Sequence, residues 1–162
     1  MPGAADSVNA IIKESAMTIS AAIRILTVDR HPWLLEGLAA VIASQPDMVL
    51  VGQASNCHDA IQQFREQIPD VTLMDLRLPD MSGIDAMIAL QTKFPGARVI
   101  TMATFEGDGP LQRALQAGAC SYILKNMPPR EIVKVIRRVA GRKCVPFAEV
   151  ANETEEDLVI RD

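Results

Sequence analysis

Two aspartates and one lysine stand at the ends of short apolar segments in this sequence. Asp29 follows IRILTV, Asp75 follows VTLM, and Lys125 follows SYIL. Such segments are typical of strands buried on both faces of a parallel sheet, and the carboxyl ends of parallel strands share one edge. Carboxylates can hold a hard cation such as Mg²⁺, and a carboxylate can also attack phosphorus to give an acyl phosphate. An ammonium group beside them can neutralise phosphoryl oxygens.

Five apolar segments alternate with segments of helical spacing along the chain. The predicted strands are 23–28, 48–54, 71–74, 98–103 and 121–124. The last helical segment has the clearest apolar face, which comprises Ile132, Val135, Ile136, Val139 and Ala140. Gly118 and Gly141 follow the fourth and fifth helical segments, where we expect left-handed helix caps. This alternation predicts an α/β fold with an open, doubly wound parallel sheet and five helices.

The chain has three predicted parts. Residues 1–22 are an N-terminal extension, 23–143 form the folded domain, and 144–162 form an acidic tail or truncated linker. The extension has one basic residue and no continuous apolar stretch, so it is a poor signal peptide. No apolar run is long enough to span a bilayer. We therefore expect a cytoplasmic protein that has no membrane partner.

The composition of the 162 residues excludes several classes of protein. Apolar residues make up 49% and charged residues 22%, which excludes a disordered chain. The net charge of −4 gives no global sign of nucleic-acid binding. Cys57, Cys120 and Cys144 form no CxxC or Cys/His cluster, so we expect small apolar fillers in a reducing compartment rather than a zinc site or disulfide framework.

The motifs at the predicted strand ends resemble those of a known family. ILTVDRHPWLLEGLAAVI, VTLMDLRLPDMSGIDAM and AGACSYILK are similar to the receiver domains of bacterial two-component response regulators. The nearest branch is the LuxR/FixJ-type (NarL-like) class, whose receivers usually open with VDDHP. The resemblance covers about residues 23–143. It implies a flavodoxin-like three-layer sandwich with strand order 2-1-3-4-5, in which Asp29 and Asp75 lie on neighbouring strands.

The resemblance also implies roles for single residues. Asp75 corresponds to the phosphoacceptor of a histidine kinase or phosphotransfer protein, and Lys125 to the lysine that contacts the phosphoryl group. Asp29 corresponds to the first metal-binding acid, and Arg77 would offer its backbone carbonyl to Mg²⁺. Tyr122 corresponds to the aromatic residue whose rotamer follows phosphorylation. The loop that shapes the pocket would contain Leu78, Pro79 and Gly83.

Two positions depart from the family pattern. Arg30 stands where a second metal-binding acid is usual, and Ala103 stands where a hydroxyl residue is usual. Thr104 follows, but one step along a strand turns a side chain to the opposite face. Arg30 could pair with a pocket aspartate, extend into solvent, or itself stabilise a phosphoryl group in place of the metal. We favour weak Mg²⁺ binding and poor phosphotransfer.

The chain also lacks room for the helix-turn-helix output domain of the LuxR/FixJ class, because only 19 residues follow Lys143. The segment 144–162 carries six acidic residues and one arginine, which disfavours direct nucleic-acid binding. Residues 126–143 are basic and could form a solvated helix face, a docking surface for a partner or a second copy, or a face onto which the acidic tail folds back. The resemblance implies dimers through the fourth and fifth helices. A truncated regulator and a stand-alone receiver both remain open.

Other function classes match less well. A haloacid-dehalogenase-like phosphatase would need a second aspartate where Arg77 stands, and a flavin carrier would need a phosphate loop where DRHPWLL stands. The sequence thus predicts a non-enzymatic signalling module. Whether it is a phosphorylation-dependent switch or a phosphorylation-independent scaffold stays open. His31 is interpreted as a helix-entry residue rather than a base or ligand.

Overall fold

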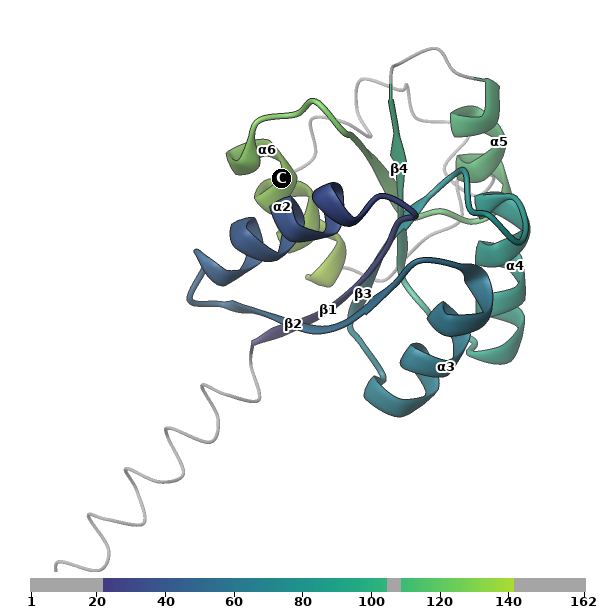
Figure 1. Cartoon of the computed structure of the whole chain (residues 1–162), viewed down its shortest axis with the longest axis horizontal. Helices are drawn as coiled ribbons and strands as arrows, with labels where there is room; N and C mark the ends of the chain where they lie inside the picture. Colours follow the sequence, from purple (N-terminus) through teal and green to yellow (C-terminus); the bar gives the residue numbers. More distant parts are fainter. Residues whose placement is uncertain (1–21, 105–108, 142–162) are drawn as a thin grey trace, which may run out of the picture.

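The computed structural model describes residues 22–104 and 109–141, which form alternating strands and helices (Figure 1). The elements are β1 (Ile23–Val28), α2 (Pro32–Ala43), β2 (Met48–Ala54), α3 (Cys57–Gln67), β3 (Val71–Asp75), α4 (Gly83–Lys93), β4 (Val99–Ala103), α5 (Gly109–Ala117), β5 (Ser121–Leu124) and α6 (Pro129–Ala140). All five predicted strands are present, and none differs from its prediction by more than one residue. The predicted extension, apart from residue 22, and the predicted tail lie outside the described residues.

The five strands form one parallel sheet in the order β2-β1-β3-β4-β5. The predicted doubly wound topology is therefore confirmed. Every residue of β3 and β4 is buried, because helices cover both faces of the sheet. No helix in the described part of the chain is long and apolar enough to cross a membrane.

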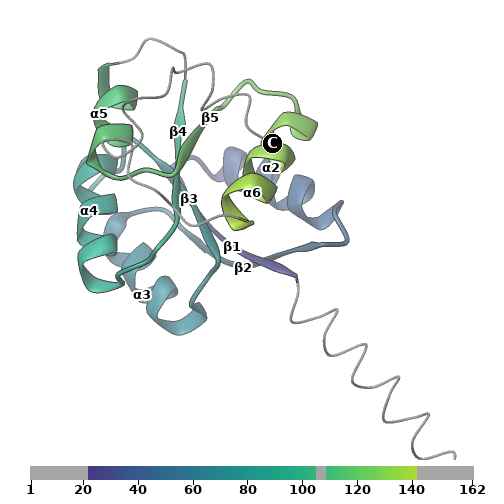
Figure 2. The ribbon, with the colours of Figure 1, turned by 180° about the vertical axis from the view of Figure 1, so that it is seen from behind.

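The helices divide the core into two apolar clusters, one on each face of the sheet. On one face α2 and α6 pack beside each other, and on the other lie α3, α4 and α5 (Figures 1 and 2). Ile42 and Ile136 belong to the first cluster, whereas Phe64 and Met87 belong to the second. The carboxyl edge of the sheet, where each strand is followed by the connection to the next helix, lies between these clusters.

Helix ends follow the sequence rules only in part. Gly118 has the predicted positive φ of 125° after α5. Gly141 does not, since it adopts right-handed helical geometry with φ −85°, so the second predicted left-handed cap is wrong. The α3 C-cap is instead left-handed at Ile68, with φ 46°. The last turn of α6 is also tied to the sheet: the Arg98 guanidinium donates to the carbonyl of Ala140 at 2.7 Å.

The cysteines differ from one another. Cys57 is buried in the cluster under α3 and has a free thiol, as the filler interpretation predicts. Cys120 is disulfide-bonded, so the prediction of a free filler is wrong at that position. Cys144 lies outside the described residues.

Candidate functional site

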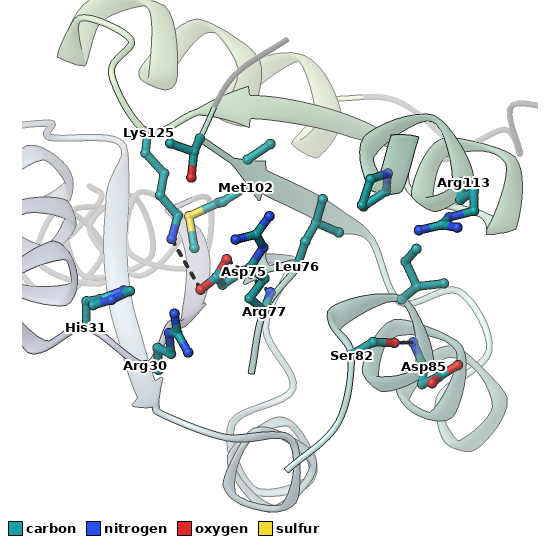
Figure 3. Close-up of a pocket in the computed structure, with 14 residues that line it drawn as sticks. Arg30, His31, Asp75, Leu76, Arg77, Ser82, Asp85, Met102, Arg113 and Lys125 are labelled. Carbon is teal, nitrogen blue, oxygen red and sulfur yellow. Dashed lines mark hydrogen bonds and ion pairs between the residues drawn. The ribbon is translucent and has the colours of Figure 1, made fainter. Parts of the chain in front are cut away.

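Asp29, Asp75 and Lys125 meet at the carboxyl edge of the sheet (Figure 3). Asp29 directly follows β1, Asp75 ends β3, and Lys125 directly follows β5. Backbone hydrogen bonds extend the parallel ladder past the strand ends, from Asp29 N–H to the carbonyl of Ala54 and from Lys125 N–H to that of Ala103. The side chains are thus positioned by the rigid sheet rather than by loops.

One ammonium group compensates two buried carboxylates. Lys125 Nζ lies 2.9 Å from Asp29 Oδ2 and 3.2 Å from Asp75 Oδ2. Asp29 is fully buried and Asp75 is 3% exposed. Among the described residues, neither Oδ2 atom accepts a well-directed hydrogen bond, so Lys125 is the group that offsets the burial of these two oxygens.

The surroundings of Asp75 disfavour the ionised form of its carboxyl group. Its pKa is raised first by burial and then by the charge of Asp29. Lys125 and the backbone N–H of Arg77, which lies 3.2 Å from Asp75 Oδ1, lower the pKa but do not cancel these effects. A partly desolvated carboxylate is less tied to water, and it has a cation beside it to receive a negatively charged electrophile.

The loop from β3 to α4 closes tightly over the acceptor strand. Gly83 N–H donates to the carbonyl of Leu76 at 2.8 Å, and a Cβ at Gly83 would lie 2.2 Å from the carbonyl oxygen of Asp75. Only glycine allows this close approach of the two backbones. Leu78 is buried beneath the loop, whereas Pro79 is exposed.

The sequence interpretation missed two contacts at this edge. His31 is the N-cap residue of α2, in line with its predicted helix-entry role, but its Nδ1 also lies 3.1 Å from Asp29 Oδ1. One ligand atom each from Asp29, His31 and Asp75 lie within 4.8 Å of one another. Asp80 caps α3 from the β3–α4 loop through the N–H groups of Cys57 and His58. Only spatial contacts between separate elements reveal these roles.

The residues that depart from the family pattern lie around the same pocket. Arg30 is exposed and forms no ion pair within residues 22–104 and 109–141, so of the alternatives for this residue, pairing with a pocket aspartate is absent there. Ala103 is 3% exposed. Thr104 also lines the pocket. It follows the last residue of β4, Ala103.

Tyr122 lies in the middle of β5. It is partly buried and packs against the cluster formed with α3, α4 and α5. It therefore lies on the strand that Lys125 directly follows, and it is not among the residues that line the pocket.

The pocket above Asp75 has a volume of about 380 Å³ and a cationic lining. Arg30, Arg77, Arg113 and Lys125 all border it. In the view of Figure 3, the guanidinium groups of Arg30 and Arg77 lie on either side of the Asp75 carboxylate. The pocket gives the carboxylate a route to an external reactant.

The chain is similar to a known protein family over most of the described residues. Residues 25–137 match the family described as the response regulator receiver domain. The chain belongs to this family. The receiver resembles NarL/LuxR-type proteins, as predicted from its motifs.

Two curated relatives and one solved structure illustrate the similarity. The receiver is 33% identical to the uncharacterized transcriptional regulatory protein YxjL of Bacillus subtilis over 136 residues, covering 82% of this chain and 62% of YxjL. It is 32% identical to the nitrate/nitrite response regulator NarL of Escherichia coli K12, covering 75% and 56%. A LuxR-family response regulator from Aurantimonas sp. has a TM-score of 0.70 at 32% identity, covering 82% and 99%. The chain thus spans about three fifths of the length of these curated relatives.

Proposed function

We propose that this receiver takes part in two-component phosphorelay signalling, with Asp75 as its phosphoacceptor. The observation that carries the proposal is the contact of Lys125 with both Asp29 and Asp75 in a pocket that Asp75 and Lys125 line. A histidine kinase or phosphotransfer protein would supply the phosphoryl group from a phosphohistidine. An Asp75 carboxylate oxygen forms the new O–P bond, the P–N bond breaks, and the imidazole keeps the electron pair and gains a proton. The chain acts as a signalling module and not as an enzyme.

Each neighbour of Asp75 has a part in this proposal. Lys125 leaves its ion pair with Asp75 to contact a phosphoryl oxygen, while Asp29 keeps the ammonium in place. Tyr122, Ala103 and Thr104 occupy the switch positions. Because Ala103 has no hydroxyl group, it donates no hydrogen bond to the phosphoryl group, so we infer a weaker conformational response than in receivers with a hydroxyl residue there.

The side chains at this pocket are poor ligands for Mg²⁺, the ion that membership of the family implies. Mg²⁺ prefers octahedral oxygen ligands, and here Asp29 and Asp75 supply carboxylates while Arg77 could add its carbonyl. The third side chain within ligand distance is His31, a nitrogen donor. Lys125 already binds both carboxylates, and Arg30 adds positive charge where an acid is usual. We infer weak Mg²⁺ binding and slow phosphotransfer.

Incubation with a small phosphoryl donor tests the proposed function. Phosphoramidate should add one phosphoryl group to the full chain, as measured by intact mass spectrometry, and Asp75→Asn should abolish the addition. Glu36→Gln, on the exposed side of α2, is the matched control. Titration calorimetry should find Mg²⁺ affinity that is weaker than in Arg30→Asp. If no phosphoryl group reaches Asp75 under any condition, the phosphorylation-independent scaffold replaces this proposal.

The basic residues of α6 support a homodimer proposal. Arg130 and Lys134 are exposed, and Arg137 pairs with Asp47 of its own chain at 2.8 Å. Arg137 is therefore a poor probe, because its reversal would break an internal contact. Arg130→Glu should weaken a dimer formed through α5 and α6 in sedimentation experiments. The absence of direct nucleic-acid binding and the cytoplasmic location stay predictions, since they depend on sequence alone.

A further inference from the structure

The guanidinium groups around the pocket have no partner within the described part of the chain. Arg30, Arg77 and Arg113 are exposed, and none of them forms an ion pair or side-chain hydrogen bond with the described residues. Lys125, in contrast, is engaged by Asp29 and Asp75. The pocket is thus lined by one cation that is ion-paired, Lys125, and by three guanidinium groups without a partner among the described residues.

The charges that line the pocket favour an anionic occupant. Four Lys or Arg side chains border it, against the two carboxylates of Asp75 and Asp85. A divalent cation entering this pocket would be repelled by the guanidinium groups, whereas a phosphoryl group would be attracted. Guanidinium groups bind phosphate oxygens with two parallel N–H···O bonds, so they suit this role better than a point charge does.

We propose that Arg30 and Arg77, together with Lys125, hold the incoming phosphoryl group in place of a divalent cation, so that phosphotransfer to Asp75 proceeds without metal. This inference rests on the proposed function, in which Asp75 is the acceptor. Cationic side chains and Mg²⁺ stabilise the same developing charge on a transferring phosphoryl group. Arg30 and Arg77 line the same pocket as Asp75, and in Figure 3 their guanidinium groups lie on either side of its carboxylate, so both can approach a phosphoryl group attached there.

The reaction balances without a metal ion. With a phosphoramidate donor, whose nitrogen is protonated near neutral pH, an Asp75 oxygen forms an O–P bond as the P–N bond breaks, and neutral ammonia leaves with the electron pair of that bond. Arg30, Arg77 and Lys125 change no protonation state in this step. They offset the negative charge of the phosphoryl oxygens and of Asp75 itself.

Labelling with and without a divalent cation tests the inference. The full chain is incubated with phosphoramidate in EDTA or in excess Mg²⁺, and the rate of phosphoryl addition is followed by intact mass. The wild-type rates should agree within about twofold, whereas Arg30→Asp should lose about tenfold or more in EDTA and recover in Mg²⁺. Arg30→Ala should lose rate in EDTA to a similar extent. Arg65→Asp, an exposed reversal on α3 away from the pocket, should behave like wild type.

The outcomes separate this inference from the proposed function. Labelling of the wild type in Mg²⁺ but not in EDTA overturns the inference and leaves Asp75 as the acceptor. An Arg30→Asp rate that is unchanged in EDTA also overturns it, because Arg30 would then contribute nothing. Failure of every variant to label in either buffer overturns the proposed function itself. Because Arg30 is exposed, its substitution should leave the circular dichroism spectrum unchanged.

Discussion

Asp80 caps the helix that begins at Cys57, although 23 residues separate them in the chain: its Oδ1 accepts the Cys57 N–H at 2.9 Å. Oδ2 accepts the N–H of His58 at 3.1 Å. The loop that follows the acceptor strand is thereby attached to the first turn of α3. The contact therefore restrains the loop between β3 and α4.

Asp80→Ala should destabilise the fold by about 1 kcal/mol, the usual cost of replacing a capping side chain by alanine. Burial raises the pKa of Asp80, but backbone N–H groups, first those of Cys57 and His58 and then those of Asp80 and Met81, together outweigh this and leave the pKa lowered. The carboxylate therefore stabilises the fold above its ordinary pKa of 3.8, and this contribution is lost as pH falls through the lower folded value. Urea unfolding of Asp80→Ala and of the exposed control Glu36→Gln at pH 7 and pH 3 measures both effects. Equal stability of the two variants at pH 7 would contradict the capping role.

Gly83→Ala should cost about 2 kcal/mol, because its Cβ would meet the Asp75 carbonyl oxygen at 2.2 Å and force the loop outward. It should also slow phosphoryl addition at Asp75. Gly37→Ala is the matched control, since nothing lies within 4 Å of its Cβ position inside α2. That change should instead stabilise the fold by roughly 0.5–1 kcal/mol. Thermal unfolding distinguishes them, and losses of similar size in both would contradict the close-approach explanation.

Ile68→Gly should stabilise the fold, although it removes a large apolar side chain. Ile68 is 71% exposed and has a φ of 46°, where a β-branched residue is strained. Relief of that strain should exceed the added backbone entropy of glycine by roughly 0.5–1 kcal/mol. Ile68→Ala retains a Cβ and should show little gain. A lower unfolding midpoint for Ile68→Gly than for Ile68→Ala would sink this prediction.

Asp75→Asn should raise the free energy of unfolding at pH 7, by on the order of 1 kcal/mol. Burial, followed by the charge of Asp29, raises the pKa of Asp75, so its ionisation opposes folding once pH exceeds the ordinary value of 3.8. The neutral amide removes that penalty and leaves Lys125 to Asp29 alone. The advantage over wild type should shrink as pH falls towards 4. An advantage that does not change with pH in urea titrations would show that charge is not its cause.

The sequence predicts the strand ends well because apolar segments bounded by charged residues report local burial directly. Asp29, Asp75 and Lys125 lie as expected for that reason. It does not predict that Lys125 binds both carboxylates while Arg30 remains exposed, since that outcome depends on competition between side chains from different strands. Similarly, glycine at position 141 suggested a left-handed cap, but the left-handed position is Ile68, a residue type that seldom adopts this conformation and so gives no signal in the sequence.

Two hydrogen bonds from Arg98 connect the end of α6 to the residue that precedes β4. The Arg98 guanidinium donates to the carbonyls of Val139 at 3.4 Å and of Ala140 at 2.7 Å. The last carbonyls of a helix have no partner within the helix, and here a cation binds two of them. The orientation of the last turn of α6 is therefore coupled to the start of β4, the strand whose other end lines the pocket.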